Sequence, residues 1–310
     1  MKSLPSGLIV TFIVLSGSFP GAGAQTPAED APKFRSSADV VTIQASVRTP
    51  RGRPVRGLTP SDFEVRDNGQ ARPILSLRAD SHSPVSVAIL VDTSGSMGAG
   101  LNAQLARHAY ECLLSQLHGR RDEAALFSFD SELHEHRPFT SDMTLLRGAL
   151  EGIELFGSTS LYDAAAAGAR RLSARSAAHK ALIILTDGVD TSSTLTAEEV
   201  STLAGSIGVP VYVIATVPSL DQRSLTEAVQ RRPRANAVDL RNLAEWTGGM
   251  LLFATNPTEA MEVATRLLDE LRQQYVIAIE AAAVRQWRRL DVRVKRTSAI
   301  VKARSGYFGG

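Results

Sequence analysis

Oxygen-bearing side chains crowd a short segment that follows the apolar run Val85–Val91. Asp92, Ser94 and Ser96 alternate with other residues there, so a loop that curls around one point can direct all three oxygens at it. Gly95 permits the tight backbone path that such a loop needs. Hard oxygen donors with few carboxylates suit Mg²⁺, which keeps several of its bound waters. The segment therefore predicts a divalent-cation site.

Two later segments supply more oxygens. Thr159 lies in Gly157–Asp163, just before an alanine-rich helical pattern, and Asp187 follows the apolar run Ala181–Leu185 with Thr186 between them. Ligands of open α/β sheets bind at the carboxyl ends of the strands. We therefore expect Thr159 and Asp187 to lie near the segment that begins at Asp92.

Together the three segments resemble a known cation site. Asp-x-Ser-x-Ser after a strand, a later Gly-x-Thr and a Thr-Asp-Gly after another strand resemble the metal-ion-dependent adhesion site of von Willebrand factor type A domains, which integrins also contain. The resemblance covers roughly residues 83–273. It implies Mg²⁺, Mn²⁺ or Ca²⁺ as the cofactor and a partner protein that supplies an acidic residue to the metal. The ligands it implies are the hydroxyls of Ser94, Ser96 and Thr159, and the carboxylates of Asp92 and Asp187 directly or through water.

Other interpretations of these residues remain open. Asp92 and its serines could simply cap the following helix, because Asp and Ser are favoured there. A metal-dependent hydrolase is an alternative, although the sequence offers no general base beside the site and no Gly-x-Ser-x-Gly elbow around Ser94 or Ser96. We expect Asp130 and Asp190 to be solvated loop carboxylates. A protein-binding module is therefore expected rather than an enzyme, and a structural envelope protein without metal-gated binding is the remaining alternative.

The elements that must position the site alternate along the middle of the chain. Apolar runs separated by amphipathic helical patterns indicate a mostly parallel sheet covered on both faces, hence a doubly wound, Rossmann-like α/β fold. The resemblance adds that this sheet is six-stranded with one antiparallel edge strand, for which 132–137 is the candidate. Strands are expected at 85–91, 124–129, 181–185, 209–214 and 250–253, and helices near 100–118, 142–153, 160–174, 196–207, 239–247 and 257–273.

Both flanks of this region have strand-like patterns. Residues 35–82 form an N-terminal β unit, and residues 274–310 contain further strands near 275–280, 290–295 and 299–303. Neither set is large enough to bury a good core alone. We expect the two ends to form one small β-sandwich into which residues 83–273 are inserted. The flanks also resemble a bacterial exported family known only as related to von Willebrand type A domains.

The first residues have the order of a secretory signal. Lys2 is followed by the 11-residue apolar run Gly7–Gly17 and then by Ala22 and Ala24 before Gln25. Such a run is well short of the ~20 residues needed to cross a bilayer. We therefore expect a cleaved signal at 1–24, a tether at 25–34, export to the periplasm or the medium, and a mature chain without a transmembrane segment.

Charge and cysteine content exclude further classes. The 310 residues carry a formal net charge of only +2, which does not suggest a polyanion-binding protein. Basic residues of 285–296 alternate in part with apolar ones, as on a solvated sheet face, so no nucleic-acid partner is expected. The chain has one cysteine, Cys112, so it cannot form an internal disulfide.

Overall fold

A six-stranded sheet carries the middle of the chain. Its strand order is β10-β9-β8-β5-β6-β7, and β7 is the antiparallel edge strand. This confirms the expected α/β class. The computed structural model describes residues 40–217, 235–295 and 298–309, so the expected signal and tether lie outside it. The strands are β5 (Val85–Asp92), β6 (Glu123–Phe129), β7 (Leu133–Thr140), β8 (His179–Thr186), β9 (Val211–Thr216) and β10 (Leu251–Ala254).

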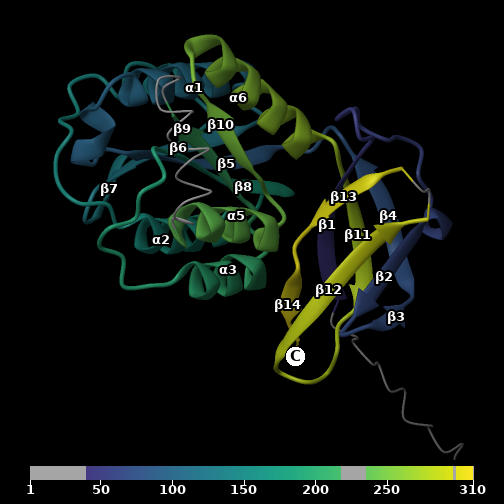
Figure 1. The fold of residues 1–310 in the computed structure, drawn as a ribbon. Helices are drawn as coiled ribbons and strands as arrows, with labels where there is room; N and C mark the ends of the chain where they lie inside the picture. The colour runs from purple at the N-terminus through teal and green to yellow at the C-terminus, as the bar shows by residue number, and fades with distance from the viewer. Residues whose placement is uncertain (1–39, 218–234, 296–297, 310) are drawn as a thin grey trace, which may run out of the picture. The chain divides into compact units, whose positions relative to one another are not determined.

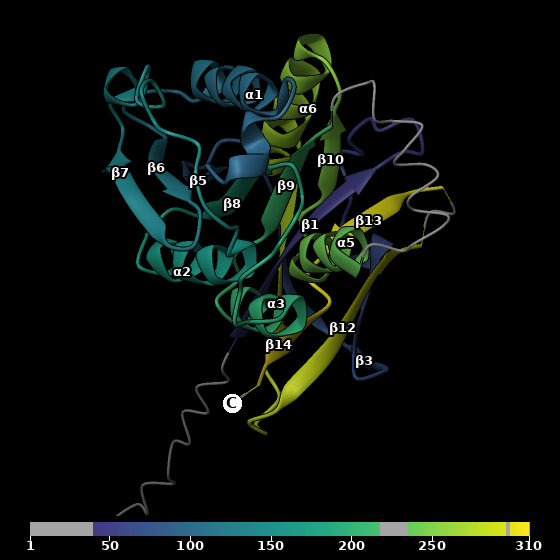
Figure 2. The same ribbon diagram turned by 60° about the vertical axis from the view of Figure 1, so that its left-hand side comes forward.

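Helices cover both faces of this sheet, which explains why its parallel strands are apolar without interruption. Ile89 packs in a cluster with α1 (Asn102–Gln116) and α6 (Pro257–Arg272), while the next residue, Leu90, packs in a second cluster on the opposite face. The second cluster includes α2 (Leu161–Ser173), α3 (Ala197–Ser206) and α5 (Ala235–Thr247). Figures 1 and 2 show the two helical layers with the sheet between them. Of the helices described, none has the length and apolarity to cross a membrane.

The prediction of a helix at 142–153 is wrong. The segment contains only the short 3₁₀ helix η3 (Met143–Leu145), followed by turns. Leu146 and Leu150 are buried at the spacing of a helix, which produced the misleading pattern. Gly148 and Gly152 have φ of 69° and 77°, a left-handed conformation that interrupts a helix.

The two ends of the chain form two further four-stranded sheets, as expected. Their orders are β13-β1-β11-β4 and β14-β12-β2-β3. Ile43, Phe63, Ile277 and Tyr307 belong to a single buried cluster between them, so the sheets form a sandwich with its own core. The short strands β3 and β14 were not expected. The bounds are β1 (Val40–Arg48), η1 (Pro60–Asp62), β2 (Phe63–Asp67), β3 (Gln70–Arg72), β4 (Ile74–Asp80), β11 (Gln274–Glu280), β12 (Trp287–Val294), β13 (Ile300–Ala303) and β14 (Gly306–Phe308).

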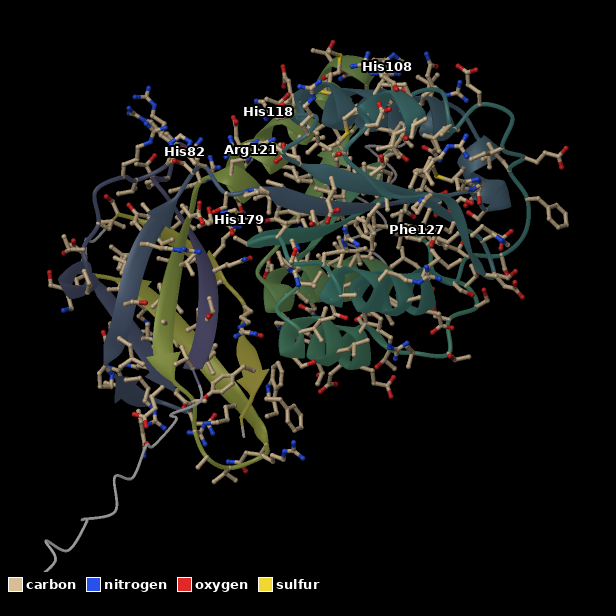
Figure 3. All side chains as sticks on the ribbon, turned by 180° about the vertical axis from the view of Figure 1, so that it is seen from behind. His82, His108, His118, Arg121, Phe127 and His179 are labelled. Carbon is tan, nitrogen blue, oxygen red and sulfur yellow. The ribbon has the colours of Figure 1, made fainter. Side chains whose placement is uncertain are left out.

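The chain leaves and re-enters the sandwich on neighbouring strands. Asp80 at the end of β4 pairs with Gln274 at the start of β11. His179, labelled in Figure 3, is 1% exposed at the first residue of β8, and its Nε2 lies 3.4 Å from Oδ2 of Asp80. Residues 38–310 form one compact unit, so the domain boundaries at 82/83 and 273/274 stay predictions.

Candidate metal centre

The first part of the candidate site is the carboxylate at the end of β5. Every residue of β5 is buried, and Asp92 itself has no exposed surface. Its Oδ1 accepts a hydrogen bond of 2.9 Å from the backbone N–H of Ser94, and its Oδ2 accepts one of 2.6 Å from Oγ1 of Thr186. The carboxylate is therefore fixed in orientation by the loop that follows β5 and by the last residue of β8.

The loop after Asp92 presents two hydroxyls side by side. Ser94 is buried and Ser96 is exposed, at the start of the 3₁₀ helix η2 (Gly95–Gly98), and their Oγ atoms are 3.1 Å apart. Two adjacent ligands of an octahedral Mg²⁺, each at ~2.1 Å, are separated by about 3 Å. The spacing of the two hydroxyls thus fits neighbouring positions around one small cation.

The second segment is attached to this loop through its backbone. The carbonyl of Gly157 accepts a hydrogen bond of 3.1 Å from the N–H of Gly95. Gly157 has a φ of 91°, which only glycine adopts readily. Thr159 is 2% exposed, and its N–H donates to Oγ1 of Thr191 while its carbonyl accepts from the N–H of Thr191. Both of these hydrogen bonds are made by the backbone of Thr159 and not by its hydroxyl.

The third segment begins at the end of β8. Oδ1 of Asp187 is buried and has no hydrogen-bond partner in the described part of the chain. An ionised oxygen that is buried without a partner is costly, whereas metal coordination compensates it. Thr186, which holds Asp92, also accepts a hydrogen bond of 3.0 Å at its Oγ1 from the N–H of Gly188. The orphaned oxygen of Asp187 is the strongest indication that a cation belongs here.

Burial dominates the electrostatics of the site. It raises the pKa of Asp92 to about 6, against the hydrogen bonds from Thr186 and Ser94, which lower it, and repulsion from Asp187 raises it further. Two carboxylates close enough to repel each other in a buried place are stabilised by a divalent cation. The donor set therefore fits Mg²⁺, with hydroxyls and water completing a shell that holds only two carboxylates.

Comparison with known proteins identifies the fold of this region. Residues 87–189 match the family model of the von Willebrand factor type A domain, and all five expected ligands lie within that range. The chain contains a von Willebrand factor type A domain. A search of curated protein sequences gives no significant match.

Solved structures similar to the chain include other proteins that carry type A domains. The conserved hypothetical protein BatB from Bacteroides thetaiotaomicron is 20% identical with a TM-score of 0.48, and the match covers 60% of this chain and 98% of BatB. The vWF domain of the pilus tip protein Mfa5 from Porphyromonas gingivalis is 13% identical with a TM-score of 0.44, covering 61% and 96%. Proximal thread matrix protein 1 from the mussel byssus, with a zinc-occupied MIDAS motif, is 16% identical with a TM-score of 0.48, covering 66% and 50%.

Hydrogen bonds join the three segments of the type A domain in which the expected ligands lie. The ligand roles of Asp92, Ser94, Ser96, Thr159 and Asp187 themselves stay predictions. Among the described residues, no group of three or more His, Cys, Asp or Glu side chains is placed so that it could hold a metal ion.

Asp190 has a role that the sequence did not reveal. We expected a solvated loop carboxylate, but its Oδ1 accepts hydrogen bonds from the N–H of Leu161 and from Oγ of Ser193. It therefore caps the N-terminus of α2, where unpaired backbone N–H groups and the helix dipole favour an anion. Asp130 accepts bonds from Ser131 and Glu132 within its own turn. The hydrogen bond from Thr186 to Asp92 was also not expected from the sequence, although the threonine is part of the Thr-Asp-Gly motif.

Proposed function

We propose that the type A domain binds one divalent cation, Mg²⁺ or alternatively Mn²⁺ or Ca²⁺, through Asp92, Ser94, Ser96, Thr159 and Asp187. The cation holds a Glu or Asp side chain of a partner protein. The observation that carries the proposal is the buried Oδ1 of Asp187, which has no hydrogen-bond partner among the described residues. A cation there has few anionic donors, so an incoming carboxylate that replaces a bound water is favoured.

Binding is favoured over catalysis because the carboxylate of Asp92 is engaged in hydrogen bonds and the unpartnered oxygen of Asp187 is assigned to the cation. Both oxygens of Asp92 accept hydrogen bonds, from Ser94 and from Thr186, and so neither is poised to take a proton from a substrate. General acid–base catalysis needs a titratable group within hydrogen-bond reach of the reacting atoms. We therefore propose an adhesion or assembly module, not an enzyme.

The location is part of the same proposal. The signal-like order of residues 1–24 supports export, and the domain then works in the periplasm or outside the cell. Mass measurement of the exported protein tests this step, since cleavage gives a chain that begins at or near Gln25. A mature chain that keeps Met1 contradicts it.

The metal step is tested by thermal unfolding of the full chain with Mg²⁺, Mn²⁺ or Ca²⁺ and with chelator. A ligand that binds only the folded state stabilises it by about 2.7 kcal/mol at one hundred times its Kd. The partner step is tested by affinity capture from the envelope fraction with Mg²⁺ and with chelator. Capture that is equal under both conditions supports the structural alternative, in which binding does not depend on metal.

A further inference from the structure

The side chain of Phe156 is the most exposed of the large apolar side chains described. It is 79% exposed, and the neighbouring Leu155 is 37% exposed. Scattered apolar side chains on a surface need no explanation, but this pair immediately precedes Gly157–Thr159, one of the three segments of the candidate metal site. The exposed pair therefore lies in sequence directly beside the candidate metal site.

The backbone of this segment is attached to the metal loop on both sides of Ser94. The N–H of Phe156 donates a hydrogen bond of 2.8 Å to the carbonyl of Thr93, and the carbonyl of Gly157 accepts one of 3.1 Å from Gly95. The Leu155 side chain lies near Gly98, at the end of the same loop. Its Cδ1 is 3.9 Å from the position that a Cβ of residue 98 would occupy. Phe156 is thus held at the rim of the site by fixed backbone contacts.

We propose that Leu155 and Phe156 select partners in which an apolar or aromatic side chain stands close to the metal-binding carboxylate. This inference rests on the proposed function, because the cation fixes where that carboxylate lies. Glu151 and Glu154 are exposed on the same segment and disfavour additional acidic residues on that side. The partner is therefore a protein segment with one acidic residue flanked by apolar rather than acidic neighbours.

An exposed aromatic side chain on a backbone held by hydrogen bonds is well suited to this role. Aromatic residues dominate the binding energy of many interfaces, and a segment whose backbone is already fixed loses little backbone entropy on binding. Complete burial of a phenylalanine side chain corresponds to a factor of about ten to one hundred in affinity. Phe156→Ser should weaken binding of a matching peptide by that factor.

The probe is a displayed library of random peptides with one fixed central glutamate. The library is selected on the full chain in Mg²⁺ and, in parallel, in chelator. The wild-type chain should enrich Leu, Met, Phe, Tyr or Trp at a fixed offset from the glutamate, only in Mg²⁺. Phe156→Ser should lose that preference and keep the Mg²⁺-dependent rise in melting temperature, because its ring is exposed and lies outside the metal shell.

Phe308→Ser is the matched control, because Phe308 is 52% exposed in β14 of the sandwich. It should select the same peptides as the wild type. Mg²⁺-dependent binding without an apolar preference, or a preference that persists in Phe156→Ser, overturns this inference alone. Selection that is equal in Mg²⁺ and in chelator overturns the metal-gated function, and this inference with it.

Discussion

Thr186 donates a 2.6 Å hydrogen bond to Asp92 from a position 94 residues away in the sequence, and both side chains are fully buried. If Asp92 lay in an exposed crevice, Asp92→Ala would leave the free energy of unfolding unchanged. With the observed burial, the substitution strands the hydroxyl of Thr186 and the N–H of Ser94. We expect a cost of about 1–3 kcal/mol in metal-free unfolding free energy. Denaturant titration in chelator measures it, and Ser96→Ala, at an exposed position, should cost much less.

Substitutions of Asp187 and Asp190 should have separate effects, the first on metal binding and the second on stability. Asp187→Asn removes a charge from a buried, unpartnered oxygen, so the metal-free protein should be at least as stable as the wild type and should show no stabilisation by Mg²⁺. Asp190→Ala removes the cap of α2, so the metal-free protein should lose about 1 kcal/mol and keep its response to Mg²⁺. Melting curves of both variants with and without Mg²⁺ decide this. The reverse pattern would mean that Asp190, and not Asp187, binds the metal.

Thr159→Val should weaken cation binding with little effect on the fold. The hydrogen bonds of Thr159 use its backbone, and valine preserves the shape of its side chain. We expect the metal-free stability to change by less than ~1 kcal/mol and the Mg²⁺ affinity to fall. Calorimetric titration with Mg²⁺ gives the affinity. An unchanged affinity would remove Thr159 from the ligand set.

Asp80 should make the stability depend on acidic pH. Burial raises the pKa of its carboxyl, but hydrogen bonds from Ser83 and the nearby His179 outweigh burial and lower the pKa to about 2. A folded-state pKa below the ordinary 3.8 gives stability that is complete above about pH 4 and is lost as the pH falls towards 2. Asp80→Asn should cost about 2 kcal/mol at pH 7. In urea titrations, the difference from the wild type should shrink between pH 4 and 2, and a constant difference would contradict the assignment.

The sandwich should depend on one buried carboxylate. Asp67 has no exposed surface, and its Oδ1 accepts a 2.6 Å bond from Nε of Arg288 while its Oδ2 accepts a 3.1 Å bond from the hydroxyl of Tyr307. Asp67→Ala leaves a buried guanidinium without its partner and should cost about 3–5 kcal/mol. Asp291→Ala, which breaks an exposed pair with Arg293, is the control and should have little effect. Denaturant unfolding compares the two.

Local patterns predicted the elements better than the contacts between them. The apolar run before Asp92 is a property of neighbouring residues, so the strand and the loop at its end could be expected from the sequence. The bond from Thr186 to Asp92 and the cap from Asp190 to Leu161 join residues 94 and 29 positions apart, and no local period encodes such pairs. At 142–153 burial at helical spacing competed with left-handed glycines, and the glycines decided the backbone.

The direct pairing of Asp80 with Gln274 has a consequence for how such a protein can be built and modified. Two antiparallel strands whose ends already face each other need only a tight two-residue turn to be joined. The whole intervening segment therefore occupies the position of a hairpin loop in the sandwich. Excising it and closing the gap with Asn-Gly would leave every strand of both sheets of the sandwich in the chain. A different globular domain could be inserted between the same two residues.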